Sequence, residues 1–126
     1  MYHVAIIGES LAAQVAALAC AASGFHDIDR LQGSRHLNEQ PQVYSLGANA
    51  SRLLRALVPG SIEALGFQPD RRQVRFAKSA YLLAELPLGE FYQRRYGSPL
   101  VNFSASALTA YLEEEIGNPL KNPVSL

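Results

Sequence analysis

The chain has 126 residues, a length typical of one domain that can bury a core. Its 11 basic and 11 acidic residues balance, so we expect neither a nucleic-acid surface nor a membrane-binding footprint. One cysteine, Cys20, leaves no disulfide framework, and the sequence has no Cys/His spacing for zinc or another metal. The N-terminus lacks the basic start and cleavage signal of a secretory peptide, so we expect a cytoplasmic protein.

The first predicted elements are a strand, a turn and a helix. The apolar run from Val4 ends at Gly8 and passes into an alanine-rich helical pattern that stops at Gly24. This order is typical of the opening of a nucleotide-binding domain, whose fingerprint G-x-G-x-x-G requires three glycines. The chain has Gly8 at the first position, but Ser10 and Ala13 at the other two.

Each glycine of that fingerprint has its own physical role. The first allows the tight turn, the second allows backbone amides to approach a pyrophosphate, and the third allows close contact between helix and sheet. Ala13 adds one methyl group to the last contact. The Ser10 side chain points into the space of the phosphates, or its hydroxyl donates to an anion at the helix start. Glu9 places a negative charge beside the turn.

The pattern then predicts a second strand from Phe25 to Leu31, although its charged residues are unusual for a buried parallel strand. Gly33 to Gln42 is polar and is expected to be a loop. Leucines at helical spacing predict a helix from Asn49 to Leu57, with Asn49 or Ser51 as its cap.

The pattern in the middle of the chain predicts a helical turn and a hairpin. Ser61 to Leu65 reads as a helical turn closed by Gly66. Gln73 to Ala77 alternates polar and apolar residues, and Ala80 to Leu86 follows after two residues, so we expect an antiparallel hairpin. Nearby arginines are expected to form a solvated face; they are Arg71, Arg72 and Arg75.

The last third predicts a loop, a strand and a helix. Pro87 to Pro99 is expected to be a loop, and Leu100 to Phe103 a short strand. A helix then begins at Ser104 or Ser106 and ends at Gly117. Its predicted apolar side consists of Leu108, Tyr111, Leu112 and Ile116, and the run Glu113-Glu-Glu115 is expected on its surface. Residues 118–126 are expected to be a C-terminal tail without a strand.

Several separated stretches together resemble one family. They are Val4-Ala-Ile-Ile-Gly8, Leu46-Gly-Ala-Asn-Ala50 with Leu53-Leu-Arg-Ala-Leu57, Leu83-Ala-Glu-Leu-Pro-Leu-Gly89, and Arg95-Tyr-Gly-Ser-Pro99 with Ala107-Leu108. In this order they resemble the N-terminal part of the single-component flavin-dependent aromatic hydroxylases, the salicylate and p-hydroxybenzoate hydroxylase group of FAD monooxygenases. The resemblance implies an α/β fold over residues 1–117: a partial Rossmann-like FAD/NAD(P)-binding domain with an added antiparallel hairpin.

The resemblance also implies which positions would contact FAD. Besides Gly8, Ser10 and Ala13, relatives use an acidic residue at the end of the second strand to hold the adenosine ribose. Gln32 takes that position by spacing from Leu46, and the Asp29-Arg30 pair takes it if the loop is longer. Where relatives have an arginine at the start of the helix after the Leu100 to Phe103 strand, this chain has Ala105. Four of the expected FAD contacts are therefore altered.

Relatives are longer, and their additional part includes further strands of the nucleotide-binding sheet and the domain over the substrate. The resemblance therefore implies no catalytic residue in this chain and no hydroxylation by the chain alone. Two parallel strands without neighbours leave edges uncovered, so we expect a homo-oligomer or a partner chain that completes the sheet.

Three hypotheses follow. The chain is the FAD-binding part of a flavin monooxygenase, a degenerate interaction module that has lost FAD, or a small nucleotide or anion binder that uses the turn from Gly8 to Ala13.

Overall fold

The computed structural model describes residues 2–32, 41–117 and 121 as a mixed α/β fold. The chain divides into two compact units: unit 1 comprises residues 1–42 and 105–126, and unit 2 comprises residues 43–104. Most of the expected loop before Gln42 (residues 33–40) and most of the expected tail (118–120 and 122–126) lie outside the described residues.

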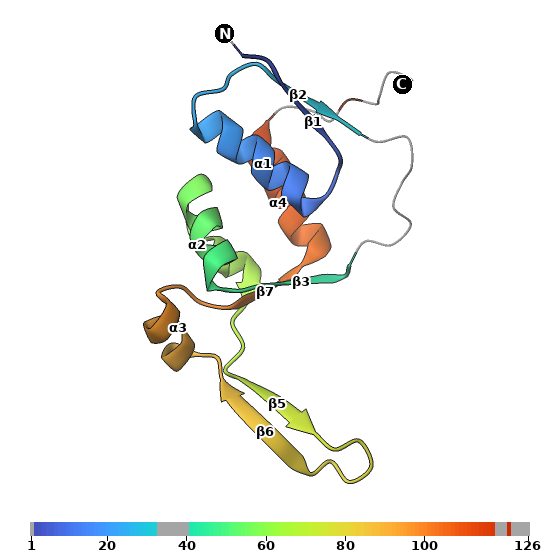
Figure 1. The fold of residues 1–126 in the computed structure, drawn as a ribbon, viewed down its shortest axis with the longest axis vertical. Coiled ribbons are helices and arrows are strands. Elements are labelled where there is room, and N and C mark those ends of the chain that lie inside the picture. Colours follow the sequence, from blue (N-terminus) through green and yellow to red (C-terminus); the bar gives the residue numbers. More distant parts are fainter. Residues whose placement is uncertain (1, 33–40, 118–120, 122–126) are drawn as a thin grey trace. The chain divides into compact units, whose positions relative to one another are not determined.

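Unit 1 contains the predicted strand–turn–helix and the second strand. Strand β1 (Val4–Ile7) leads into helix α1 (Leu11–Ala22), and strand β2 (Ile28–Leu31) pairs with β1 in parallel, with Val4 opposite Ile28. Helix α4 (Ala105–Ile116) lies beside α1 (Figure 1). The predicted β–α–β order is therefore confirmed, with β2 three residues shorter at its start than expected.

The C-terminal segment differs from the expected tail at one described residue. Lys121 forms a parallel β-bridge with Leu31, on the strand that already pairs with β1. The Lys121 amide donates to the Arg30 carbonyl at 2.8 Å, and the Gln32 amide donates to the Lys121 carbonyl at 2.8 Å. This pairing satisfies backbone groups at the edge of β2 that would otherwise need another partner.

Unit 2 contains an antiparallel sheet with the order β3 (Val43–Leu46), β7 (Val101–Ser104) and β4 (Gly66–Phe67). The strand expected at residues 100–103 is β7, although its two antiparallel partners were not expected. Glycine is required at position 66 because β7 lies very close to its backbone. A Cβ at Gly66 would lie 2.5 Å from the nearest side-chain atom of Val101. The expected closing residue of a helical turn is thus also a strand residue against β7.

Helix α2 (Ala48–Leu57) and the 3-10 helix η1 (Ile62–Leu65) confirm the helical segments expected here. The expected caps of α2 are wrong, because Asn49 and Ser51 lie inside the helix and Gly47 is its N-cap. The phenol oxygen of Tyr92 instead accepts from the Ala48 amide at 3.1 Å. A distant side chain therefore satisfies a backbone donor that a local cap usually satisfies.

The loop expected from Pro87 to Pro99 is wrong in its centre, where helix α3 (Glu90–Tyr96) forms. Gly97 ends the helix with a φ of 79°, and its amide donates to the Gln93 carbonyl at 2.8 Å. Acidic Glu90 lies in the first turn and arginines lie in the last turn, as the helix dipole favours. Pro87 and Pro99, which bound this segment, had favoured the prediction of a loop.

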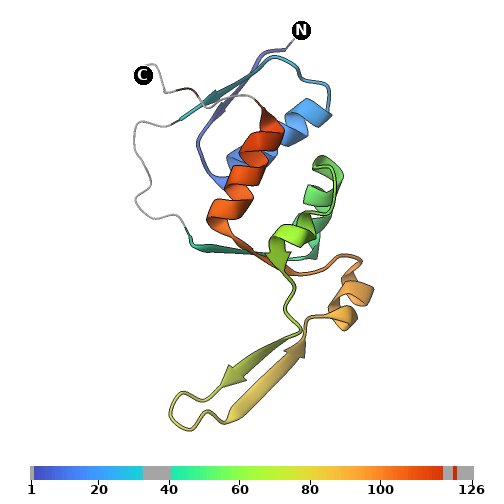
Figure 2. The same ribbon diagram turned by 180° about the vertical axis from the view of Figure 1, so that it is seen from behind.

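The predicted hairpin is confirmed, with strands β5 (Arg71–Arg75) and β6 (Leu82–Pro87). It extends from the rest of unit 2, as Figure 2 shows from behind. A register shift follows Val74, and every residue of both strands is exposed, including the expected solvated arginines.

Helix α4 begins directly after Ser104, and its buried side is the predicted one, with Leu108 and Leu112 fully buried. The other buried apolar residues of unit 1 are Ala17, Leu18 and Ala105; those of unit 2 are Ala48, Leu54, Val58, Ile62, Val101 and Phe103. Within the described residues, no helix is both long and apolar enough to cross a membrane.

Candidate functional site

The candidate site is the turn between β1 and α1, where the sequence predicted phosphate binding. Gly8 has a φ of 138°, a conformation that residues with a Cβ rarely adopt. Its amide donates to the Leu31 carbonyl at 2.8 Å, which extends the pairing of β1 with β2. A Cβ at Gly8 would lie 3.7 Å from the Ala13 Cβ, so the backbone angle, not space, requires glycine here.

Ser10 is the N-cap of α1, a role that the glycine fingerprint does not predict. Its hydroxyl oxygen accepts from the Ala13 amide at 3.3 Å, and its carbonyl accepts from the Gln14 amide at 3.1 Å. Serine is a preferred N-cap, so its position before a helical run was the signal. One amide of the first turn is therefore already partnered by the protein, which leaves fewer donors for an anion.

Gln32 and Glu9 lie together at the ends of the two parallel strands. Gln32 directly follows β2, and its amide nitrogen donates to the Glu9 carboxylate at 2.7 Å. The turn thus places the Gln32 side-chain amide and the Glu9 carboxylate beside the start of α1. A carboxylate opposes a phosphate by like charge and can accept a hydrogen bond from a hydroxyl.

Asp29, the alternative ribose position, lies inside β2 opposite Ala5. Its carboxylate accepts from Lys121 Nζ at 2.6 Å and lies 3.1 Å from His3 Nε2. The other ring nitrogen of His3 lies 2.8 Å from Asp27. Asp27 raises the pKa of His3, chiefly through this hydrogen bond, and Lys121 lowers the pKa of Asp29. Asp29 is thus engaged in an exposed ion cluster away from the strand end.

Ala105, at the position where the resemblance implies an arginine, is the buried first residue of α4. Its amide donates to the Gln42 carbonyl at 2.9 Å. The structure therefore gathers Gly8, Ser10, Ala13 and Gln32 around the start of α1, while Ala105 begins a different helix. A long charged side chain at this position would have to leave the buried environment that alanine fills.

A buried polar cluster behind the turn was not anticipated. Arg30 on β2 is 1% exposed, and its two terminal nitrogens donate to the Glu113 carboxylate at 2.9 and 2.5 Å. Buried Gln14 on α1 donates to Glu113 at 2.8 Å and to the Thr109 carbonyl at 3.1 Å. Arg30 is the main cause that lowers the pKa of Glu113. The available signal was a charged residue in a predicted parallel strand, because such strands are usually buried and buried charges require partners.

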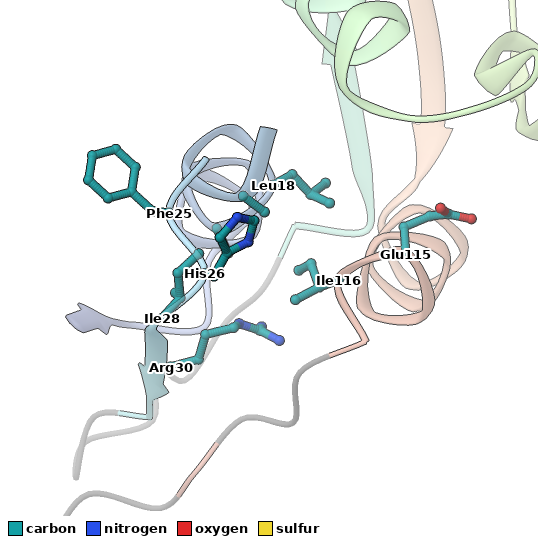
Figure 3. Close-up of a pocket in the computed structure, with 9 residues that line it drawn as sticks. Leu18, Phe25, His26, Ile28, Arg30, Glu115 and Ile116 are labelled. Atoms are coloured by element: carbon teal, nitrogen blue, oxygen red, sulfur yellow. The ribbon is translucent and has the colours of Figure 1, made fainter. Parts of the chain in front are cut away.

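A pocket of about 190 Å³ lies beside this cluster in unit 1 (Figure 3). Its lining is mostly apolar and comes from α1, the segment between α1 and β2, β2 itself and the end of α4: Ala17, Leu18, Ala21, Phe25, His26, Ile28, Arg30, Glu115 and Ile116. The Glu115 carboxylate points away from Ile116 and from the other labelled side chains. This pocket was not predicted from the sequence.

The described part of the chain holds no group of three metal-ligating side chains among His, Cys, Asp and Glu. Cys20 is free and half-buried on α1. The polar groups at the turn are the backbone amides at the start of α1, the Ser10 hydroxyl, the Gln32 side-chain amide and the Glu9 carboxylate.

The fold is similar to part of the fold of several solved enzyme structures. Klebsiella pneumoniae HpxO complexed with FAD and uric acid matches 90% of this chain and 28% of its own chain, with 22% identity and a TM-score of 0.73. The tetrameric form of 2-methyl-3-hydroxypyridine-5-carboxylic acid oxygenase matches 97% of this chain and 31% of its own, with 17% identity and a TM-score of 0.73.

A salicylate hydroxylase substrate complex matches 96% of this chain and 28% of its own, with 18% identity and a TM-score of 0.67. No protein-family model matches the sequence. The chain thus spans less than a third of the length of these structures. At these identities the likeness shows the fold alone, which this chain shares with part of each of these structures.

Proposed function

We propose that this chain corresponds to the FAD-binding part of an FAD-dependent monooxygenase of the aromatic hydroxylase type. The observation that carries the proposal is the match of 90% of the chain to the FAD complex of HpxO. The Gly8 turn supports it, because it joins a parallel strand to a capped helix as nucleotide-binding folds do.

The proposed contacts use groups that the structure holds at one end of unit 1. The start of α1 would face the phosphates of FAD, and Gln32 would hydrogen-bond a ribose hydroxyl in place of an acidic residue. The Gln32 position is favoured over Asp29, because Gln32 follows β2 directly while Asp29 pairs with Lys121. A bound flavin would supply the redox chemistry.

The donor set fits FAD only in part. Glu9 lies beside the turn, and Ser10 uses its hydroxyl and the Ala13 amide to cap the helix. Both features reduce the attraction for phosphate, so we propose weak FAD binding by the chain alone. More than two thirds of the length of HpxO has no counterpart here, so we also propose that hydroxylation needs additional protein.

A second candidate is an interaction module that keeps the fold and binds no flavin. The Glu9–Gln32 hydrogen bond favours it, because it ties the proposed ribose contact to a carboxylate. A third candidate, a small anion binder at Ser10, is disfavoured by the charge of Glu9.

We also propose that a partner chain or a second copy completes the sheet of unit 1. Within the described residues, β1 pairs only with β2, and Ile7 at its end is 63% exposed. A parallel strand with a free edge and exposed apolar side chains is usually covered.

The test is FAD titration of the natural chain and of two variants, by calorimetry and by flavin fluorescence. Gln32→Glu alone places two carboxylates at hydrogen-bond distance, so it should not bind FAD better. Glu9→Gln with Gln32→Glu keeps an amide–carboxylate pair and moves the acid to the ribose position. We expect weak binding by the natural chain and about ten-fold tighter binding by the double variant.

Sub-micromolar affinity of the natural chain would contradict the proposed weak site. No detectable binding by any of the three proteins, with unchanged circular dichroism, would favour the interaction module instead.

A further inference from the structure

The pocket of unit 1 is closed on one side and open on the other. Ala17 and Leu18 on α1 line it and are buried, whereas Ala21 and His26 line it and are exposed. Most of the other lining side chains are apolar. A concave, mostly apolar surface with a few polar groups is typical of a binding site for a small molecule.

The size of the pocket limits a ligand to about one ring. Its volume is about 190 Å³. A cavity of about 150 Å³ holds benzene, and pockets for drug-sized ligands begin at about 300 Å³. The pocket therefore has room for one aromatic ring with one small substituent.

The polar groups of the pocket are those of its basic side chains (Figure 3). His26, Arg30 and Ile116 point toward a common space, whereas Glu115 points away from it. Arg30 is buried and donates two hydrogen bonds to Glu113, so its charge is already matched by a carboxylate. The His26 imidazole is exposed at the rim, and in its neutral form it donates at one nitrogen and accepts at the other. It can therefore form a hydrogen bond with a polar substituent on a ligand.

We propose that this pocket binds a neutral compound that has one aromatic ring and one hydroxyl group. The ring packs against Leu18, Ile28 and Ile116, and the hydroxyl group forms a hydrogen bond with His26. A charged ligand is disfavoured, because burying a charge without a partner is costly. The turn at Gly8 does not line this pocket, so the site goes beyond the proposed flavin contacts.

The test is titration of the full chain with benzyl alcohol and, separately, with toluene, which lacks the hydroxyl group. Binding is followed by two-dimensional NMR of the methyl groups. We expect saturable shifts at Leu18, Ile28 and Ile116, with a dissociation constant for benzyl alcohol of about 0.1–1 mM. The methyl groups of Leu54, which lies in unit 2 and does not line the pocket, should keep their chemical shifts.

Two variants separate the apolar walls from the hydrogen bond. Ala21→Leu places a larger side chain at the rim and should weaken the binding of both probes about ten-fold, because it fills part of the pocket. Ala12→Leu is the matched control, because it makes the same change at an exposed residue of α1 outside the pocket and should leave both dissociation constants unchanged. His26→Ala should weaken the binding of benzyl alcohol about five-fold and leave that of toluene unchanged, because only the alcohol forms a hydrogen bond with the imidazole.

Circular dichroism should be the same for all variants, because the substituted residues are exposed. Chemical shifts that do not saturate, or that change equally in both units, would overturn the proposal. So would an Ala21→Leu protein that binds both probes as tightly as Ala12→Leu does. A His26→Ala protein that keeps its full affinity for benzyl alcohol, or loses equal affinity for both probes, would overturn the assignment of the hydroxyl group to His26.

Discussion

Removal of the Glu113 carboxylate should strongly destabilise the fold, because it leaves Arg30 buried without its bidentate partner. The Arg30 side chain is 2% exposed, while the Glu113 side chain is 42% exposed. Breaking a buried ion pair typically costs 3–5 kcal/mol, and water reaches this carboxylate, so we expect about 3 kcal/mol for Glu113→Ala. Gln14 also loses an acceptor.

The measurement is urea unfolding followed by far-ultraviolet circular dichroism, with the free energy of unfolding extrapolated to water. Glu114→Ala is the matched control, because Glu114 is the next residue on α4 and is exposed; its effect should stay within about 0.5 kcal/mol. Arg30→Met combined with Glu113→Leu should recover most of the loss, since an apolar pair replaces a buried ion pair at little cost.

Two results would refute this reasoning. One is a Glu113→Ala protein as stable as Glu114→Ala, which would mean that Arg30 finds water or another partner. The other is a double variant no more stable than Glu113→Ala, which would mean that packing around the pair, not the unpaired charge, decides stability.

Three other outcomes are expected. Ser10→Ala should lower the free energy of unfolding by about 1 kcal/mol through loss of the α1 cap, while Ser10→Gly should cost less; equal melting temperatures for all three proteins would contradict the cap. Gly66→Ala should destabilise unit 2 by about 1–3 kcal/mol, because its Cβ overlaps Val101, and an unchanged urea midpoint would show that β4 shifts freely. The pKa of His3 is raised, so its contribution to stability is present below the unfolded value of 6.5 and is lost as pH rises through the higher folded pKa. NMR titration should show a lower His3 pKa in Asp27→Asn, and an unchanged pKa would exclude that hydrogen bond in solution.

The sequence by itself determined the elements whose signals are local. The turn at Gly8 follows from a strand pattern, a residue free to adopt positive φ and a helical run, and the structure has all three. The buried side of α4, with Leu108 and Leu112, follows from helical periodicity, and the hairpin follows from alternation around a short break. These features depend on residues that are close together in the sequence.

Tertiary structure decided the features that depend on residues far apart in the chain. Arg30 is tolerated in β2 because Glu113, 83 positions later, supplies its partner. Tyr92 caps α2 from 44 positions away, and β7 pairs antiparallel with strands on both sides. No local pattern encodes such pairings, because a buried charge or an open backbone donor only indicates that a partner is needed, and the fold determines which residue it is.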